Sequence, residues 1–478
     1  MKRRAAALAG LLLAACSSTT PPATENVATD SSLLQRDGRW MVDSDHRVHL
    51  LHGVNAVWKV APYAPSANAD GFTAADADFL AANGFNAVRL GVLFAGVMPQ
   101  QGVLDASYLD QVDRVVQLLA SRHIWVLLDF HQDMLNEKYQ GEGFPAWAVD
   151  DGGLPNDARE GFPADEFVSL ALNTAFDNFW SNKNAVWTPY DQALAAAAQR
   201  WHNQPYLLGY DMFNEPWPGT QWPTCFEMDC TRFDATLQQF YTQALAAVRS
   251  ADAQHLAFFE PQQLFDFGAP SGYGPVADAN IGLSWHDYCS VTLTASANLP
   301  VELPDCTIIE PRTMNNADNQ ISAMGATTLI TEFGATDDTT DIGRVADLAD
   351  QHLTGWTYWA YKNWGDPTGG AVEGLFTDDS DLTTLKSAKA DVLIRPYAQA
   401  VAGVPTAMSF DATGKTFALT YTPRATTLPT EIFVPARHYP AGYQAQVTGG
   451  HVTSPDNATL LEVVADGSSA VQVTVTPR

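Results

Sequence analysis

Residues 207–217 have the sequence Leu-Leu-Gly-Tyr-Asp-Met-Phe-Asn-Glu-Pro-Trp. A short apolar run of this kind is typical of a strand in a parallel sheet that is buried on both faces. Pro216 cannot donate to a sheet ladder, so we expect the strand to stop there. This prediction places Asn214 and Glu215 at the carboxyl end of a strand, where a parallel barrel holds its catalytic side chains. A lone glutamate in a loop is the alternative interpretation.

A second stretch has the same form. Residues 328–334 have the sequence Thr-Leu-Ile-Thr-Glu-Phe-Gly, so Glu332 also follows an apolar run of strand length. Two carboxyl groups at the ends of two strands are the minimum that hydrolysis of a glycosidic bond requires. The two stretches together predict that Glu215 and Glu332 face each other across one sugar-sized gap.

The composition indicates a large, acidic protein. The chain has 478 residues, 46% of them hydrophobic, which is enough for a large core and more than one domain. Its net charge of −28 argues against a nucleic-acid partner and indicates a soluble, exposed protein. We expect a monomer that needs no cofactor. A metal site is not expected, because the cysteine spacings match no zinc pattern and the histidines are scattered.

The N-terminus predicts export from a bacterial cell. A basic start is followed by an apolar run at residues 5–15, which is too short to span a bilayer as a mature helix. The run ends Leu13-Ala14-Ala15-Cys16, which resembles the bacterial lipobox, in which the cysteine receives lipid and becomes the first mature residue. We therefore expect a lipoprotein signal peptide at residues 1–16 and a flexible tether at residues 17–34, rich in Ser, Thr, Pro and Ala. The predicted location is the cell envelope, as a lipoprotein, and the alternative is an ordinary signal peptide and a secreted protein.

Four cysteines remain if Cys16 carries lipid. An even number in an exported chain suggests disulfides. Three pairings are possible, of which Cys225–Cys230 with Cys289–Cys306 is the simplest, because each bond then closes a single loop.

Strand and helix patterns alternate along most of the chain. Apolar runs at residues 48–55, 86–90, 124–129, 207–215, 255–260, 280–286, 328–332 and 356–359 are separated by segments with helical spacing. Eight such alternations predict an α/β fold, a closed (β/α)8 TIM barrel over residues 35–396, with an open sheet of nine or ten strands as the alternative. From about residue 397 the helical spacing stops, and alternating runs between Gly, Pro and Asp turns predict a small C-terminal antiparallel β-sandwich at residues 397–478.

With these elements placed, the chain resembles glycoside hydrolase family 5 and, more narrowly, the endoglycoceramidases. Asn214-Glu215-Pro216 is similar to the acid/base motif of the family, and Thr331-Glu332-Phe333-Gly334 is similar to its nucleophile motif. The run Asp129-Phe130-His131-Gln132-Asp133 resembles a motif on the third strand that is more specific to endoglycoceramidases. Residues 176–180 and 395–405 add to the resemblance. It implies a catalytic pair, Glu215 and Glu332, and a substrate site formed by Lys59, Arg89, His131, Asp133, Asn214, His286, Tyr288 and Trp359.

The chemistry assigns a task to the residues nearest the pair. Glu332 must be ionised to attack, and Arg89 by charge and Tyr288 by a hydrogen bond are suited to keep it so. Glu215 must stay protonated until the leaving group departs, so we expect its pKa to be raised. Asn214 is suited to bind the sugar 2-hydroxyl.

The remaining candidates offer contacts to the sugar. Lys59, His131 and Asp133 can hydrogen-bond to hydroxyl groups, Trp359 can support a sugar ring, and His286 can contact substrate or support a neighbour. Each also has a simpler interpretation: a surface lysine, a histidine bonded to backbone, a helix cap or a core tryptophan.

A ceramide leaving group would require an apolar groove. The candidates for it are Met134, Leu135, Phe144, Trp217, Trp222, Phe226, Leu264, Phe265 and Phe267.

Three functions are compatible with these residues. The leading one is a lipid-anchored, retaining endoglycoceramidase that releases intact glycan and ceramide from a glycosphingolipid at the membrane. A cellulase-, mannanase- or exoglucosidase-like enzyme of the same superfamily is the second. The third is a non-catalytic glycan- or lipid-binding lipoprotein, against which the presence of both glutamates with Asn214 and Arg89 argues.

Overall fold

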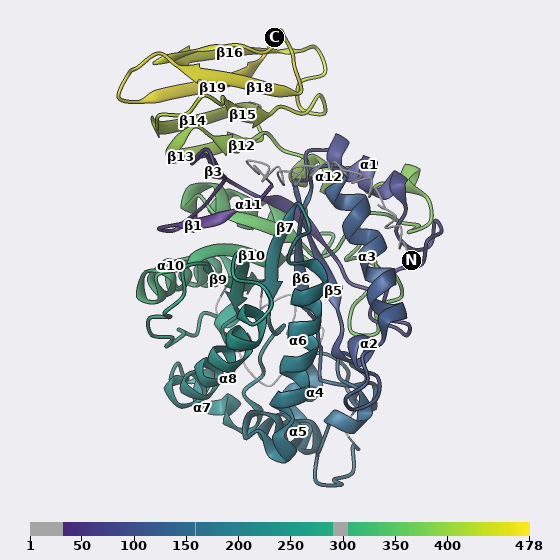
Figure 1. Cartoon of the computed structure of the whole chain (residues 1–478). Coiled ribbons are helices and arrows are strands. Elements are labelled where there is room, and N and C mark those ends of the chain that lie inside the picture. Colours follow the sequence, from purple (N-terminus) through teal and green to yellow (C-terminus); the bar gives the residue numbers. More distant parts are fainter. Residues whose placement is uncertain (1–31, 158, 290–304) are drawn as a thin grey trace, which may run out of the picture.

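The computed structural model describes residues 32–157, 159–289 and 305–478 (Figure 1). The predicted signal peptide, Cys16 and nearly all of the predicted tether lie outside the described residues. In the part of the chain that is described, none of the helices combines the length and apolar character needed to cross a bilayer.

The centre of the molecule is a closed barrel of eight parallel strands in the order β10-β11-β4-β5-β6-β7-β8-β9. This confirms the predicted barrel and excludes the open sheet. Every residue of the barrel strands is buried, as expected for strands covered on both faces. Their bounds are β4 (His52–Ala56), β5 (Ala87–Val92), β6 (Trp125–Phe130), β7 (Leu207–Asp211), β8 (Leu256–Phe259), β9 (Ile281–Asp287), β10 (Thr327–Phe333) and β11 (Gly355–Tyr358).

Helices surround the barrel (Figure 1). In α3 (Ala106–Ala120), Asp105 accepts hydrogen bonds from the first turn as a cap, and apolar residues at helical spacing face the strands. Helix α10 begins at Cys306 and continues past Pro311 to Met324, although a proline inside a helix removes one backbone hydrogen bond. The larger helices are α1 (Ala74–Ala82), α3, α5 (Leu170–Trp180), α6 (Trp187–Trp201), α8 (Thr231–Arg249), α10 (Cys306–Met324) and α11 (Thr339–His352), with short α2 (Phe94–Val97), α4 (Ala164–Val168), α7 (Trp222–Phe226) and α12 (Ser387–Leu393).

Strand β7 is shorter than the sequence predicts. It ends at Asp211 and not beside Pro216. Glu215 has a φ of 43°, which is the left-handed region and cannot continue an extended strand. Asn214 nevertheless stays beside the barrel, because its N–H donates to the Phe130 carbonyl at 3.2 Å. The two predicted site residues therefore lie in the segment just beyond the strand.

The C-terminal strands form two antiparallel sheets. A four-stranded sheet has the order β13 (Gly403–Asp411), β14 (Thr416–Pro423), β19 (Val471–Pro477) and β16 (Tyr443–Thr448). A seven-stranded sheet has the order β1 (Gln35–Asp37), β2 (Trp40–Val42), β3 (Val48–His49), β12 (Tyr397–Val401), β15 (Thr430–Phe433), β18 (Leu460–Ala465) and β17 (Gly450–Val452).

The N-terminal hairpin, formed by β1 to β3, therefore belongs to the seven-stranded sheet together with C-terminal strands. The first barrel strand that was predicted at residues 48–55 is wrong in its first half. Val48–His49 pairs with β12, and the barrel strand begins only at His52. Arg47 connects the N-terminal hairpin with the C-terminal strand β15, since it binds Asp43 at 2.9 Å and Glu431 at 2.8 Å. Pairing across so many residues leaves no local pattern in the sequence.

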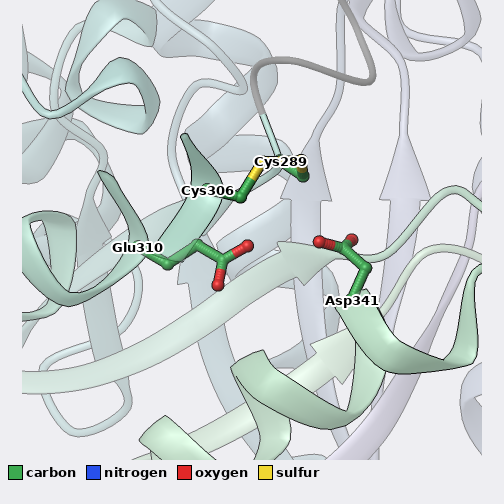
Figure 2. Close-up of side chains that lie close together, drawn as sticks. All are labelled: Cys289, Cys306, Glu310 and Asp341. Carbon is green, nitrogen blue, oxygen red and sulfur yellow. A yellow bond between two sulfur atoms is a disulfide. The ribbon is translucent and has the colours of Figure 1, made fainter. Parts of the chain in front are cut away.

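Both predicted disulfides are present. Cys225–Cys230 closes the segment around α7, and Cys289–Cys306 links the residues after β9 to the first residue of α10. Figure 2 shows Glu310 and Asp341 beside the second bond. Arg344 binds both carboxylates, at 2.7 and 2.5 Å, so this grouping is an ion-pair cluster whose cysteines have no free thiol.

Candidate active site

The loops beyond the carboxyl ends of the strands enclose a cavity of about 400 Å³, within the range of small-molecule sites. Its lining combines charged and hydroxyl side chains with apolar ones. Seven predicted site residues line it: Lys59, His131, Asp133, Glu215, Tyr288, Glu332 and Trp359. The other three, Arg89, Asn214 and His286, have no exposed surface and lie behind this lining.

The two predicted carboxyl groups meet at this cavity. Glu215 is 5% exposed and Glu332 is 4% exposed. His286 Nδ1 lies 2.8 Å from Glu215 Oε1 and 3.5 Å from Glu332 Oε2. Those two oxygens are therefore no more than about 6.3 Å apart, short of the ~6.5–9.5 Å between the carboxyl groups of inverting glycosidases. The geometry fits the retaining arrangement.

Glu332 is held by two donors. Arg89 Nη1 donates to Oε1 at 2.5 Å, and the Tyr288 hydroxyl donates to Oε2 at 2.7 Å. Burial raises the pKa of Glu332, and the positive charge of Arg89 opposes that rise. Both donors favour the charged form, so Glu332 is the carboxylate of the pair.

Glu215 has surroundings that favour a proton. Burial, and next the negative charge of Asp133, raises the pKa of Glu215 to about 8. Its neighbour His286 is neutral at physiological pH, because burial lowers the pKa of the imidazole to about 4. The amide Nε2 of Gln263 donates to Glu215 Oε2 at 3.0 Å, and the backbone N–H of Glu215 donates to Glu260 at 2.9 Å. Glu215 is thus a positioned carboxylic acid.

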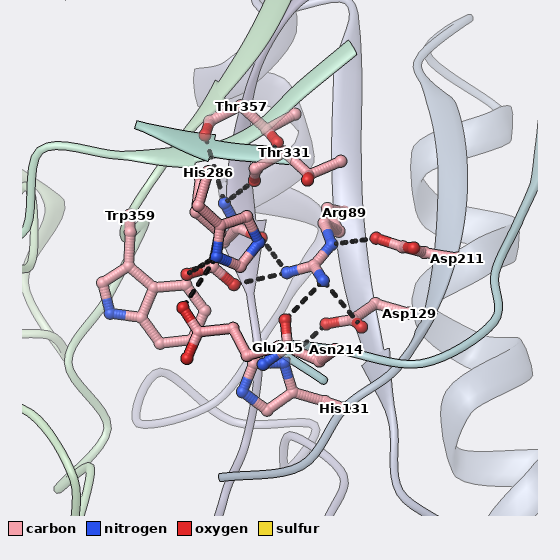
Figure 3. Close-up of polar contacts among 12 residues, drawn as sticks. Arg89, Asp129, His131, Asp211, Asn214, Glu215, His286, Thr331, Thr357 and Trp359 are labelled. Atoms are coloured by element: carbon pink, nitrogen blue, oxygen red, sulfur yellow. Dashed lines mark hydrogen bonds and ion pairs between the residues drawn. The ribbon is translucent and has the colours of Figure 1, made fainter. Parts of the chain in front are cut away.

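Arg89 connects the ends of several strands (Figure 3). From β5 it donates to Asp211 at 2.9 Å and to Asn214 Oδ1 at 2.7 Å, and it lies 2.9 Å from Asp129 Oδ1. The fixed fork of a guanidinium can bind these groups and Glu332 at once. Arg89 therefore sets the position of Glu332 relative to the neighbouring strands.

Asn214 is engaged within the protein. Its Oδ1 accepts from Arg89, and its Nδ2 donates to the Gln132 carbonyl at 3.0 Å and to Asp133 at 3.4 Å. The contact to a sugar 2-hydroxyl stays a prediction.

Lys59 binds several polar side chains in the cavity lining. Its Nζ lies 2.5 Å from Asp133, 2.9 Å from Asp366 and 2.7 Å from the hydroxyl of Thr368. Burial lowers the pKa of this ammonium, but Asp133 and Asp366 outweigh the burial and raise the pKa well above its ordinary value. Lys59 is 5% exposed, so the interpretation as a surface lysine is wrong, and Asp133 is an ion-pair partner here and not a helix cap.

His131 and Trp359 stack beside this lysine. Their rings are nearly parallel with centroids 5.4 Å apart, and Lys59 Nζ lies 4.4 Å from the centroid of the indole. His131 Nδ1 lies 2.7 Å from Asp129; although burial lowers the pKa of His131, Asp129 raises it to about 10, so the imidazole is charged. Trp359 Nε1 donates to Glu373 at 3.0 Å. Whether Trp359 supports a sugar ring stays a prediction.

The apolar lining differs from the predicted groove. Of the nine apolar candidates, only Phe267 lines the cavity. Residues such as Leu264 and Trp217 are fully buried in the packing of the loops. Other apolar residues line the cavity instead: Phe162, Pro163, Ala335 and Val372.

Several polar residues of the site were missed. Gln263 and Asp266 follow β8 and line the cavity, and their place after a strand could have indicated them. Glu142, in the insertion after β6, lies 3.9 Å from Lys59, and no local pattern predicts this contact.

Two groups of side chains have the spacing of metal ligands. His131, Asp133 and Glu142 form one, and Glu215, Asp266 and His286 form the other. The ammonium of Lys59 already neutralises the first group, and the second contains the hydrogen bond between Glu215 and His286. The ion pair with Lys59 accounts for the first arrangement, and the hydrogen bond between Glu215 and His286 accounts for the second.

A closed (β/α)8 barrel that holds a carboxylic acid opposite an arginine-bound carboxylate in a sugar-sized cavity is the framework of a glycosidase. Comparison with family models supports this class: residues 47–365 match the cellulase model of glycosyl hydrolase family 5, and residues 395–476 match the family 5 C-terminal domain.

Similarity to individual proteins identifies the subgroup within family 5. Endoglycoceramidase I of Rhodococcus hoagii (strain 103S) is 38% identical over 94% of this chain and 89% of that protein. The structure of endo-glycoceramidase II from Rhodococcus sp. in complex with a five-membered iminocyclitol has a TM-score of 0.76 at 28% identity, covering 92% of this chain and 99% of the other. The structure of that enzyme with ganglioside GM3 has a TM-score of 0.76 at 27% identity, covering 92% and 100%. The chain belongs to glycoside hydrolase family 5 and, within it, to the endoglycoceramidases.

Proposed function

We propose that this protein is a retaining glycosidase that cleaves the bond between the oligosaccharide and the ceramide of a glycosphingolipid, releasing both intact. The observation that carries the proposal is the pair formed by Glu215 and Glu332, a carboxylic acid and a carboxylate joined through His286 at one cavity. Similarity to endoglycoceramidases along nearly the whole chain supplies the substrate class.

In the first step Glu332 attacks the anomeric carbon and forms an ester with the sugar. The bond from that carbon to the ceramide oxygen breaks, and Glu215 donates its proton to this oxygen, so that ceramide leaves as an alcohol. Arg89 and Tyr288 hold the attacking carboxylate in place. The charge of Glu332 is consumed when the ester forms.

In the second step Glu215, now a carboxylate, takes a proton from water. The oxygen of that water attacks the anomeric carbon, the ester breaks and Glu332 is released as a carboxylate. Two inversions give overall retention, and Glu215 ends with its proton restored.

The mixed lining of the cavity suits the two parts of the substrate. Lys59, His131 and Asp133 supply charged hydrogen-bonding groups for sugar hydroxyls. Phe162, Phe267 and other apolar lining groups suit a lipid. A relative that was solved with ganglioside GM3 supports a glycosphingolipid as the substrate.

A panel of purified glycosphingolipids tests the proposal. We expect mass spectrometry to detect an intact glycan and ceramide. NMR of the glycan first released should show the same configuration at the anomeric carbon as in the substrate. Cleavage of cellulose or mannan alone would favour the cellulase- or mannanase-like alternative. Binding without turnover would favour a non-catalytic lipoprotein.

We further infer that the protein is an exported bacterial lipoprotein that meets its substrate at a membrane as a monomer. The sequence Leu13-Ala14-Ala15-Cys16 and the tether-like composition after it support this. Intact mass of the mature protein should begin at Cys16 and include acyl chains. A mature protein that begins elsewhere without lipid would identify the secreted form instead.

A further inference from the structure

Asp266 is a carboxyl group in the lining of the cavity, beside the catalytic acid. It lies on the short helix η5 (Gln263–Phe267), which follows β8, and it lines the cavity while being 6% exposed. A carboxylate oxygen of Asp266 lies within 4.8 Å of one of Glu215 and of a ring nitrogen of His286. It is thus next to the acid that meets the leaving oxygen.

The surroundings of Asp266 give it a proton. Burial, followed by the negative charges of Glu215, Asp287 and Glu332, raises its pKa well above the ordinary value. The backbone N–H of His286 donates to it. A protonated carboxyl group offers one donor and further acceptor positions, and a single backbone N–H uses only part of them.

Apolar residues line the same cavity as Asp266. Phe267 is the next residue, and Phe162 and Pro163 line the same cavity. The amide Nε2 of Gln263, the other polar side chain of this helix, is already bonded to Glu215. Asp266 is therefore a buried hydrogen-bonding group with unused capacity, and a ligand that fills this capacity recovers an interaction that an apolar ligand leaves unmet.

We propose that Asp266 recognises the polar head of the aglycone, by hydrogen bonds to an amide N–H or hydroxyl a few bonds beyond the glycosidic oxygen. The inference rests on the proposed function, since it assigns a specificity-determining residue to the same site. In ceramide the carbon next to the oxygen-bearing carbon carries the amide, and the following carbon carries a hydroxyl. When the glycosidic oxygen meets Glu215, these groups come within reach of a carboxyl group as close as Asp266.

This arrangement makes Asp266 select among aglycones. An alkyl chain without polar groups can pack against the apolar lining residues but leaves Asp266 without a partner. A buried polar group that loses its partner discriminates strongly between ligands of similar shape. Glycosides of ceramide are therefore favoured over glycosides of a plain long-chain alcohol.

The test compares three substrates that share one glycan, linked to ceramide, to an unbranched alkyl alcohol and to nitrophenol. For Asp266→Leu we expect kcat/KM on the ceramide glycoside to fall about 10–100-fold. On the alkyl glycoside it should not fall, because the binding of an apolar chain no longer leaves a buried carboxyl group without a partner, and on the nitrophenyl glycoside it should fall much less than on the ceramide glycoside. Asp266→Asn, which keeps a donor and an acceptor, should retain most of the preference for ceramide.

A neighbouring variant provides the matched control. Phe267→Leu removes apolar contact from the same helix, so we expect it to weaken the ceramide and alkyl glycosides alike. A loss on Asp266→Leu that is equal for all three substrates, with a shifted basic limb of the pH profile, would show that Asp266 only tunes Glu215, and the inference would be overturned.

The result separates this inference from the proposed function. If the wild type cleaves ceramide glycosides and both Asp266 variants keep its aglycone preference, only the inference fails. If the wild type leaves ceramide glycosides intact while it hydrolyses other glycans, the proposed function fails. Turnover of the nitrophenyl glycoside reports that each variant is folded, and Asp266→Ala, which also removes the hydrogen-bonding group, supplies the comparison should Asp266→Leu be unstable.

Discussion

Arg89 Nη1 lies 2.5 Å from Glu332 Oε1, although the two residues are 243 positions apart and come from β5 and β10. Neither side chain can exchange this partner for water easily, since Arg89 is fully buried and Glu332 is 4% exposed. The barrel thus fixes the charge and direction of one carboxyl group before any substrate arrives. Such preorganisation is the main way in which an enzyme stabilises a transition state.

Glu332→Gln keeps the shape of the side chain but removes the nucleophilic carboxylate. We expect turnover of a glycosphingolipid to fall by about a thousandfold or more, as for the loss of other nucleophiles. The melting temperature and the binding of glycan should change little. Product formation at the wild-type rate would contradict the assigned role.

Arg89→Lys tests geometry apart from charge. A lysine keeps one positive charge but cannot bind Glu332, Asp211 and Asn214 together. We expect kcat to fall about 10–100-fold, because each lost hydrogen bond to a charged group contributes ~1.5–3 kcal/mol. Arg200→Lys is the control: this arginine pairs with Asp110 at the surface, and such exposed pairs contribute little. If both variants kept full activity, the fork of Arg89 would not matter.

The pH profile follows from the proton on Glu215. This residue must be protonated to act as an acid, and its pKa is raised to about 8. We therefore expect kcat/KM on glycosphingolipids to fall as pH rises through about 8. Glu215→Gln should remove this limb, together with most of the activity. A nitrophenyl glycoside, whose leaving group needs little protonation, should depend less on pH above this value.

The two carboxyl groups that the sequence identified share one property, which is a place at the end of a strong local pattern. Glu332 ends an uninterrupted apolar run and indeed lies on β10. Glu215 was found in the same way, but the expected end of its strand was wrong, because β7 ends at Asp211 and Glu215 has a left-handed φ of 43° that the apolar run does not indicate. Local patterns therefore located both carboxyl groups without describing their backbone.

The rest of the site depends on contacts between distant loops. Asp266 reaches the cavity because the loop after β8 lies beside the backbone of His286, and Glu142 reaches Lys59 from the insertion after β6. The N-terminal hairpin joins β12 over more than 300 residues for the same kind of reason. Periodicity carries no information on such pairs, so the barrel was predictable while its loops and the composition of the seven-stranded sheet were not.

The disulfide Cys289–Cys306 is expected to hold Tyr288 against Glu332. Tyr288 directly precedes Cys289, and its hydroxyl donates to Glu332 at 2.7 Å. In the double variant Cys289→Ser, Cys306→Ser we expect kcat to fall about tenfold. This loss corresponds to the free energy of about one hydrogen bond to a charged group. The acid limb of the pH profile should move to higher pH, because Glu332 loses a donor that favours its charged form.

Two comparisons separate this effect from a general loss of stability. Tyr288→Phe should reproduce the shift, and adding it to the cysteine variant should cause little further loss, as expected for residues that act together. Cys225→Ser, Cys230→Ser removes the other disulfide and should lower the melting temperature without moving the acid limb. Equal shifts from both cysteine variants would assign the effect to folding.

Stability itself should fall as pH rises, because the fold buries several carboxyl groups that prefer a proton. Burial raises the pKa values of Glu142, Glu166 and Asp287 well above those of ordinary carboxyl groups. Between the unfolded and folded pKa values the folded state binds more protons than the unfolded state, so the free energy of unfolding decreases with pH in that window. We expect a higher melting temperature near pH 5 than near pH 8. Glu166→Gln, which cannot titrate, should reduce this difference, whereas Glu227→Gln on the surface should leave it unchanged. A melting temperature that rises steadily from pH 5 to pH 8 would show that groups with lowered pKa values, such as Asp252, dominate instead.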